Sequence, residues 1–293
     1  MSRFLSIAFL FLFFANSSSV FGIPQKNESN SGKHRKVILN MEDGSQKSGY
    51  IKEFRKSVVV DDGNNLLGNK SMENKFGLQT KKFTFKKDLD SKKETLSIDQ
   101  IKSIEFVLNT DDFNINETIV YEKVKLAKLK NNHDLKKENV FTLLPVYFKN
   151  SKITVYYFIV NDSPKFYFKG SRADYALYQN FKMTDIFKPQ NYTDRLYGIF
   201  EFIGKDCPEY LSWVNSAKNK TYRPTSKPVL KETSEYKIID SYQKDIKTAK
   251  KEMSEEEYEA YLEWRSYQKT KGMMDSSYSI YNEFVVQYIN SCE

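Results

Sequence analysis

Aromatic residues between positions 147 and 168 are the clearest indication of binding chemistry in this sequence. The group consists of Tyr147, Tyr156, Tyr157, Phe166, Tyr167 and Phe168. On an exposed sheet, such rings could stack against a sugar or a peptide, because each tyrosine joins a flat apolar face to a polar hydroxyl. However, the segment 153–160 is largely apolar at both odd and even positions, which is typical of a strand buried on both faces. The pattern favours a core, and the four tyrosines are kept as candidate ligand-binding residues.

The chain has two cysteines, Cys207 and Cys292. In an oxidising compartment they could form a disulfide, which would stabilise the fold by roughly a few kcal/mol through its effect on the unfolded chain. Two isolated thiols are the alternative, and the spacing does not decide between them. Cys207 begins a predicted helix but lacks a well-placed histidine, so we interpret it as structural and not as a nucleophile.

Histidine is equally scarce. His34 and His133 are the two histidines of the chain, and both lie in polar segments without a Gly-x-Ser-x-Gly partner. So few histidines and cysteines argue against zinc catalysis, zinc fingers and haem attachment. We therefore predict no catalytic residue, no metal and no cofactor. Hydrolysis by paired carboxylates is the alternative, since 38 Asp and Glu residues leave many pairs that sequence spacing does not resolve.

Two segments approach known ligand-binding motifs without completing them. The segment 63–71 comes near a phosphate-binding loop, but the inserted Asn69 displaces Lys70 by one position. The segment 112–123 begins like a calcium loop, but Lys123 stands where the last, bidentate carboxylate is required. We interpret both segments as polar connections between strands.

The segment 81–87, with the sequence KKFTFKK, interleaves basic and aromatic residues. Modules that bind nucleic acids combine stacking rings with phosphate contacts in this way. In a strand, however, Phe83 and Phe85 point to one face and Lys82 and Lys86 to the other, which is the pattern of a solvated edge strand. The formal net charge of +8 is moderate for 293 residues. We do not expect nucleic acid as a partner.

Residues 1–22 have the layout of a secretory signal peptide. Arg3 is followed by an apolar run of about 12 residues and then by a polar stretch ending in small residues. The run is shorter than the roughly 20 residues that a membrane-spanning helix needs, and no second long apolar run follows. We predict export to the periplasm, cell surface or extracellular space, without a transmembrane anchor after signal removal. Residues 23–36 are predicted to be a mobile lead-in.

The remaining sequence predicts an α+β fold with a strand-rich N-terminal half and a C-terminal helical region. Two-residue alternation and tight turns over 37–170 predict a β-rich domain. Within it, 37–106 suggests a small barrel or curled antiparallel sheet, and 118–168 suggests further strands. A change to helical periodicity after about residue 172 and one polar stretch divide the C-terminal part into predicted segments. Its predicted parts are a helical segment packed on the sheet at 171–222, a linker at 223–233, and helices within 234–293, namely 235–252, 255–271 and 275–290.

A resemblance to a family rests on the stretch VILNMEDGSQKSGYIKEF and the ending ETLSIDQIKSIEF. These segments resemble the opening unit of uncharacterised exported proteins of Bacteroidetes-type bacteria, and their pattern is similar to an Sm-like or SH3-like small barrel. The later GKDCPEYL resembles an Asp-Cys-Pro helix start towards the end of those chains. The resemblance covers about 37–106 and 190–215. It implies location and architecture, and it brings no activity to transfer.

The sequence favours a non-enzymatic binding or scaffolding protein of the periplasm or cell surface, with an unknown envelope protein or glycan as its partner. The alternative is a carboxylate-dependent hydrolase acting on envelope glycans, with the aromatic group as its sugar platform. A third class is a surface protein that adheres to an anionic envelope through its positive charge, which would make its binding strongly salt-dependent.

Overall fold

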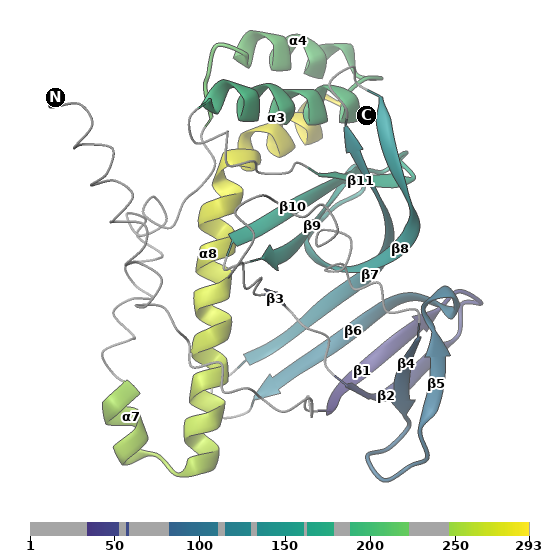
Figure 1. The fold of residues 1–293 in the computed structure, drawn as a ribbon, viewed down its shortest axis with the longest axis vertical. Helices are drawn as coiled ribbons and strands as arrows, with labels where there is room; N and C mark the ends of the chain where they lie inside the picture. Colours follow the sequence, from purple (N-terminus) through teal and green to yellow (C-terminus); the bar gives the residue numbers. More distant parts are fainter. Residues whose placement is uncertain are drawn as a thin grey trace, which may run out of the picture. The chain divides into compact units, whose positions relative to one another are not determined.

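The computed structural model has a strand-rich N-terminal half followed by C-terminal helices, which confirms the predicted α+β class (Figure 1). It describes residues 34–52, 57–58, 82–110, 115–129, 134–160, 163–178, 188–222 and 246–292. The predicted signal peptide at 1–22, the phosphate-loop-like segment at 63–71 and the linker at 223–233 lie outside the described residues.

The first strands form a curled antiparallel sheet. They are β1 (His34–Met41), β2 (Gln46–Lys52), β4 (Lys82–Lys86), β5 (Glu94–Ser97) and β6 (Ile101–Thr110), in the spatial order β6-β1-β2-β4-β5. Gly44, with a φ of +83°, makes the tight turn from β1 to β2 at the predicted Asp-Gly position. A short 3-10 helix, η3 (Ile98–Gln100), leads from β5 into β6, which returns to pair with β1.

This curled sheet has its own core. Its fully buried members on β1, β2 and β6 include Val37, Leu39, Ile51, Ile101 and Ile104, each with no exposed surface. They alternate along the strands with exposed or half-buried residues, which is the two-residue period that a sheet with one buried face requires. The described strands within 37–106 therefore form the curled sheet that the sequence suggested.

The next five strands close into a ring. They are β7 (Ile115–Leu129), β8 (Leu135–Lys149), β9 (Ile153–Val160), β10 (Ser163–Gly170) and β11 (Tyr175–Tyr178). Each pairs antiparallel with the next, and β11 also pairs parallel with β7, from Tyr175 opposite Lys125 to Tyr178 opposite Lys128. Because β7 also pairs with β6, the ring and the curled sheet are continuous. The two-residue strand β3 (Ser57–Val58) pairs with the end of β9.

Two irregularities accompany this closure. The pairing register shifts between Lys125 and Ala127 of β7, and between Val146 and Phe148 of β8. Such shifts increase the local twist and bend a long strand, which lets it turn around a ring. β11 lies at the start of the segment 171–222 that the sequence assigned to helices. That assignment was wrong for 175–178, where the chain completes the sheet before the helices begin.

Four described helices follow: α3 (Pro189–Ile203), α4 (Pro208–Ala217), α7 (Ile246–Glu252) and α8 (Glu255–Ser291). Proline stands in the first turn of α3 and α4, where the missing N–H is least harmful. The sequence predicted two separate helices at 255–271 and 275–290, but α8 is one helix of 37 residues. A helix-interior glycine such as Gly272 disfavours the helix by only about 1 kcal/mol, and burial of the adjacent Met273 and Met274 offsets this.

Helices α3 and α4 and the C-terminal part of α8 pack on the outer face of the ring. Phe168 of β10, Phe200 of α3 and Phe284 of α8 meet in this core, and the last two rings are stacked with centroids 4.5 Å apart. The opposite face of the same strands encloses a smaller core that includes Leu144, Tyr156 and Phe158. Both faces of β9 are therefore buried, which explains its nearly continuous apolar sequence.

Candidate functional site

The four tyrosines singled out from the sequence do not form one surface. Tyr156 and Tyr167 face the interior of the ring, whereas Tyr147 and Tyr157 face the helices. This division follows from the strands themselves, because neighbouring residues such as Tyr156 and Tyr157 point to opposite faces. A shared stacking platform for a sugar would need the rings on one side.

The interior pair is structural. Tyr156 is 2% exposed, and its hydroxyl donates a hydrogen bond to Glu122 over 2.8 Å. Burial, assisted by the negative charge of Glu122, raises the pKa of Tyr156 far above its ordinary value of 10. Tyr167 packs against the ring of Tyr178, with centroids 5.3 Å apart. Both side chains fill the ring and are not presented to a ligand.

The outer pair joins the sheet to α8. The hydroxyl of Tyr147 donates to a carboxylate oxygen of Asp275 over 2.7 Å, and its ring lies 4.6 Å from that of Tyr278. Burial and this hydrogen bond raise the pKa of Tyr147 well above 10. Tyr157 completes the contact from β9, with its ring 6.4 Å from Tyr147. This pair acts as a connection between layers.

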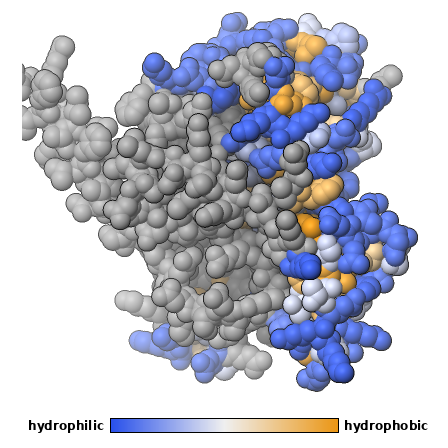
Figure 2. All heavy atoms as spheres, turned by 45° about the vertical axis from the view of Figure 1, so that its right-hand side comes forward, coloured by the Kyte–Doolittle hydropathy of each residue, from blue (hydrophilic) through white to orange (hydrophobic). Residues whose placement is uncertain are grey.

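Large apolar side chains are scattered over the exposed surface of the described part. The most exposed are Leu89, Phe148, Leu262 and Val286, which belong to the β4–β5 turn, β8 and two distant turns of α8. In the coloured part of Figure 2, hydrophilic residues dominate and hydrophobic atoms form small groups among them. Single exposed apolar residues are ordinary and do not define a docking surface.

A pocket provides a better candidate site. Its volume is about 720 Å³, and it lies where the β10–β11 turn, the α3–α4 connection and the end of α8 meet. Phe168 and Leu177, both buried, contribute apolar surface from the ring strands. The size lies within the range of ligand pockets in proteins. None of the four sequence-selected tyrosines lines it.

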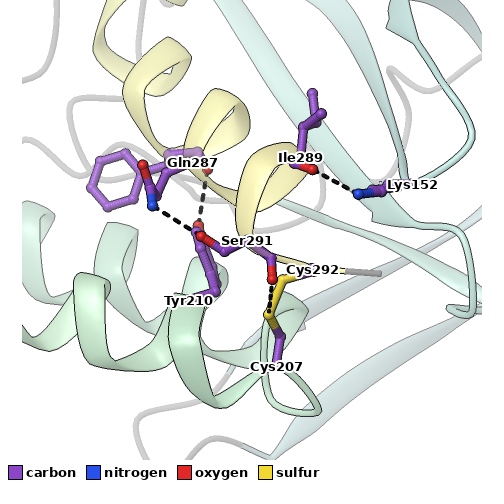
Figure 3. Close-up of a disulfide and its surroundings, with 8 residues drawn as sticks. Lys152, Cys207, Tyr210, Gln287, Ile289, Ser291 and Cys292 are labelled. Carbon is purple, nitrogen blue, oxygen red and sulfur yellow. Dashed lines mark hydrogen bonds between the residues drawn. A yellow bond between two sulfur atoms is a disulfide. The ribbon is translucent and has the colours of Figure 1, made fainter.

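A disulfide holds one wall of this pocket together. Cys207 and Cys292, whose pairing the sequence left open, are joined, with their Cα atoms 5.6 Å apart. Cys207 is the N-cap of α4, and Cys292 follows the last turn of α8. Figure 3 shows how the bond ties the start of one helix to the end of the other. Both cysteines line the pocket.

Hydrogen bonds hold the same end of α8 in place. Lys152, at the start of β9, donates from Nζ to the Ile289 carbonyl oxygen over 2.7 Å (Figure 3). The hydroxyl of Tyr210 on α4 donates to the Phe284 carbonyl oxygen over 3.1 Å. A cation near the last carbonyls of a helix is favourable because it offsets their partial negative charge. The wall is therefore anchored by a disulfide, the sheet and a neighbouring helix.

The pocket carries charges of both signs. Its cationic side chains are Lys137, Lys152, Arg172 and Lys205, and its carboxylates are Asp174, Asp206 and Glu209. The ammonium group of Lys137 lies 5.1 Å from the centroid of the Tyr175 ring, and that of Lys205 lies 5.3 Å from the Phe202 ring. These cation–π contacts restrict where the two lysines lie.

The other charged groups at the opening are not paired with one another. The side chains of Arg172, Asp174, Asp206 and Glu209 are exposed and make no hydrogen bond or ion pair within the described part of the chain. Glu209 stands in the first turn of α4, where a negative charge is favourable. Within the same part of the chain, the side chains of Arg172, Asp174 and Asp206 have no comparable interaction with a helix terminus, and they are available to a ligand.

Tyr288 brings a hydroxyl to the same place. The missing side chain of Gly170 leaves room there, since a Cβ atom at that position would lie 3.6 Å from the tyrosine hydroxyl. Burial raises the pKa of Tyr288, the charge of Arg172 lowers it, and that of Asp206 raises it. The hydroxyl thus stays protonated near neutral pH and is influenced by a cation and a carboxylate of the pocket.

The groups that the described residues bring to this site are charged side chains and hydrogen-bonding groups. Within the described residues, no group of three or more His, Cys, Asp or Glu side chains could hold a metal ion, and no helix could span a membrane. The two sulfur atoms are in a disulfide and offer no thiol nucleophile. The sequence singled out the Asp206–Glu209 segment only as a helix start. Nothing in its spacing showed that Arg172 and Tyr288 would lie beside it.

The fold and the site together define a mixed α+β protein with a five-strand ring and a charged pocket locked by a disulfide. Comparison of the chain with family models, with curated proteins and with solved structures finds no match in any of the three.

Proposed function

We propose that this chain is an exported, non-enzymatic binding protein of the periplasm or cell surface, and that its partner, an envelope protein or glycan, enters the pocket beside Cys207 and Cys292. The observation that carries the proposal is the pocket of about 720 Å³ with unpaired charged groups at its opening. A pocket with some apolar lining and convergent polar groups is the usual form of a ligand site.

Two observations support export. The first 22 residues have the charge, length and polarity pattern of a cleaved signal peptide. A disulfide between residues 85 positions apart is stable in oxidising compartments and rare in reducing ones. Detection of an uncleaved N-terminus on the native protein, inside the cell, would contradict export.

The test is a pull-down from envelope extract with a pocket-filling variant. The mature chain, starting at residue 23, is immobilised and its bound material is identified by mass spectrometry. Gly170→Phe should abolish capture because the new ring would occupy the pocket next to Tyr288 and Ile203. Gly170→Ala is the matched control, since its Cβ atom meets its neighbours at ordinary contact distances, 3.6 and 3.7 Å.

The pull-down has two possible outcomes. A partner that is retained by the wild-type chain and by Gly170→Ala, but lost with Gly170→Phe, supports binding in the pocket. If no partner is retained, or if Gly170→Phe captures the same partner as well as the wild type does, the proposed function is wrong.

A carboxylate-dependent hydrolase of envelope glycans is the second candidate. It is favoured by one observation, the presence of Asp174, Asp206 and Glu209 in a pocket that also contains Tyr175 and Tyr288. Glycoside hydrolysis requires two carboxylates on opposite sides of the bond that is cut. Turnover of an envelope polymer by the wild type, lost in Asp206→Asn and retained in the distant Lys102→Gln, would establish this candidate in place of the binder.

A further inference from the structure

The pocket presents cations and carboxylates on the same walls. The β10–β11 turn carries Arg172 and Asp174, and the α3–α4 connection carries Lys205 and Asp206. Side chains of opposite charge lie two positions apart or adjacent on each wall, yet no ion pair joins the pocket's charges within the described part of the chain. The charges are therefore left for water or for a ligand to satisfy.

The charge of the ligand follows from this arrangement. A purely anionic ligand would bring its charge close to Asp174, Asp206 and Glu209, and a purely cationic one would meet four basic side chains. Like charges brought together repel each other, and this repulsion would oppose the binding of either kind of ligand. A ligand with separated charges of both signs avoids either repulsion.

The donors define where each end of such a ligand would lie. Arg172 presents a planar guanidinium, which can bind a carboxylate through two parallel hydrogen bonds. The Tyr288 hydroxyl, whose pKa is influenced by Arg172, can donate to the same group. Asp174 and Asp206 accept hydrogen bonds from an ammonium group, because ionised carboxylates are acceptors only.

The rings of the pocket are less suited to a sugar. Lys137 covers one face of Tyr175, Lys205 covers one face of Phe202, and Tyr288 packs against Tyr210 with ring planes 79° apart. Stacking of a sugar needs an open aromatic face. The apolar surface that is left comes from the half-buried Leu135 and Ile203, and it fits an aliphatic side chain.

We propose that the pocket binds a short zwitterionic peptide, with its terminal carboxylate at Arg172 and Tyr288 and its ammonium group at Asp174 and Asp206. This inference rests on the proposed binding function and names the chemistry of its ligand. An apolar side chain of the peptide packs on Leu135 and Ile203.

The experiment uses a complete library of tripeptides with free termini and the mature, disulfide-bonded chain. Peptides retained by the protein are identified by mass spectrometry, and the affinity of the most enriched one is measured by calorimetry. Two derivatives are measured beside it: the C-terminal amide, and the form acetylated at every amino group. Cellotetraose serves as a neutral sugar probe.

The expected result is enrichment of specific tripeptides and a loss of at least about tenfold in affinity for each derivative, because each removes one charge-assisted contact. Arg172→Gln should weaken binding of the free acid by a similar factor and leave binding of the amide nearly unchanged. Asp174→Asn should weaken binding of the peptide with free amino groups by a similar factor and leave binding of the acetylated form nearly unchanged. Lys102→Gln, which also removes one exposed positive charge, should bind like the wild type.

Three results would overturn the inference: no enriched tripeptide, equal affinity for the amide and the free acid, or binding of cellotetraose in place of peptides. Its failure is distinguishable from failure of the proposed function. If a partner is still captured from envelope extract and lost with Gly170→Phe, the pocket binds a ligand of other chemistry; if neither capture nor enrichment occurs, both are wrong.

Discussion

Removal of the disulfide should lower the free energy of unfolding by an amount set by the length of the loop that the bond closes. Cys207 and Cys292 are 85 positions apart, and closing a loop of that length removes about 4.5 kcal/mol of conformational entropy from the unfolded state at 25 °C. For a protein of this size, that corresponds to a fall of roughly 10 °C or more in Tm. The double variant Cys207→Ser/Cys292→Ser avoids leaving a single free thiol.

The assay is urea unfolding followed by intrinsic fluorescence, on the wild type and the double variant, each with and without a reductant. The reductant should destabilise the wild type to the level of the double variant and leave the variant unchanged. Far-ultraviolet circular dichroism should show the same helix content in both, because the aromatic core around Phe200 and Phe284 does not depend on the bond. A reduced wild type whose thiols titrate as free, but whose free energy of unfolding falls by less than about 1 kcal/mol, would refute the argument.

Three further predictions concern the packing. Phe284→Ala should lower the free energy of unfolding by about 3–5 kcal/mol, since its ring is fully buried. A double-mutant cycle with Phe200→Ala should show a coupling energy of about 0.5–1.5 kcal/mol, because the two rings are stacked. Purely additive losses would contradict the stacked geometry. Gly49→Ala in β2 should destabilise the fold by about 1–3 kcal/mol, because its Cβ atom would clash with the backbone carbonyl oxygen of Lys86 and lie 2.5 Å from the Phe85 ring. An unchanged midpoint in urea would show that the sheet is looser there. Burial raises the pKa of Tyr210 above 10, so the unfolded state loses this proton first and the free energy of unfolding should fall as the pH rises above about 10. In a plot of unfolding free energy against pH, Tyr210→Phe should have a shallower slope than the wild type in this range. An equal slope would contradict the assignment.

Local patterns in the sequence were enough to place many of the elements. The alternation of Val37, Leu39 and Met41, followed by an Asp-Gly pair, predicted β1 and its turn because a half-buried strand has a period of two. The apolar residues on both sides of the segment 153–160 predicted a strand buried on two faces, and the structure has it between the helices and the interior of the ring. These features depend on neighbours within a few residues, so one sequence contains them.

Helix boundaries were predicted less well. Separate helices were predicted at 255–271 and 275–290, but α8 is continuous, and Met273 and Met274 between them are buried. The strand at 175–178 was missed because four residues give too short a pattern. Its pairing with β7, some fifty positions earlier, makes it a strand. In both cases, tertiary packing outweighs a weak local preference.

The sequence by itself determined the α+β class, the strand-rich order of the N-terminal half and the apolar character of the aromatic group. Only the tertiary structure decided that β11 closes a ring on β7, that Cys207 meets Cys292, and that Arg172 and Tyr288 share a pocket with Asp206. The physical reason is distance along the chain. Periodicity reports which face of an element is buried, whereas the meeting of β10, α4 and the end of α8 depends on how whole layers pack, which no local pattern records.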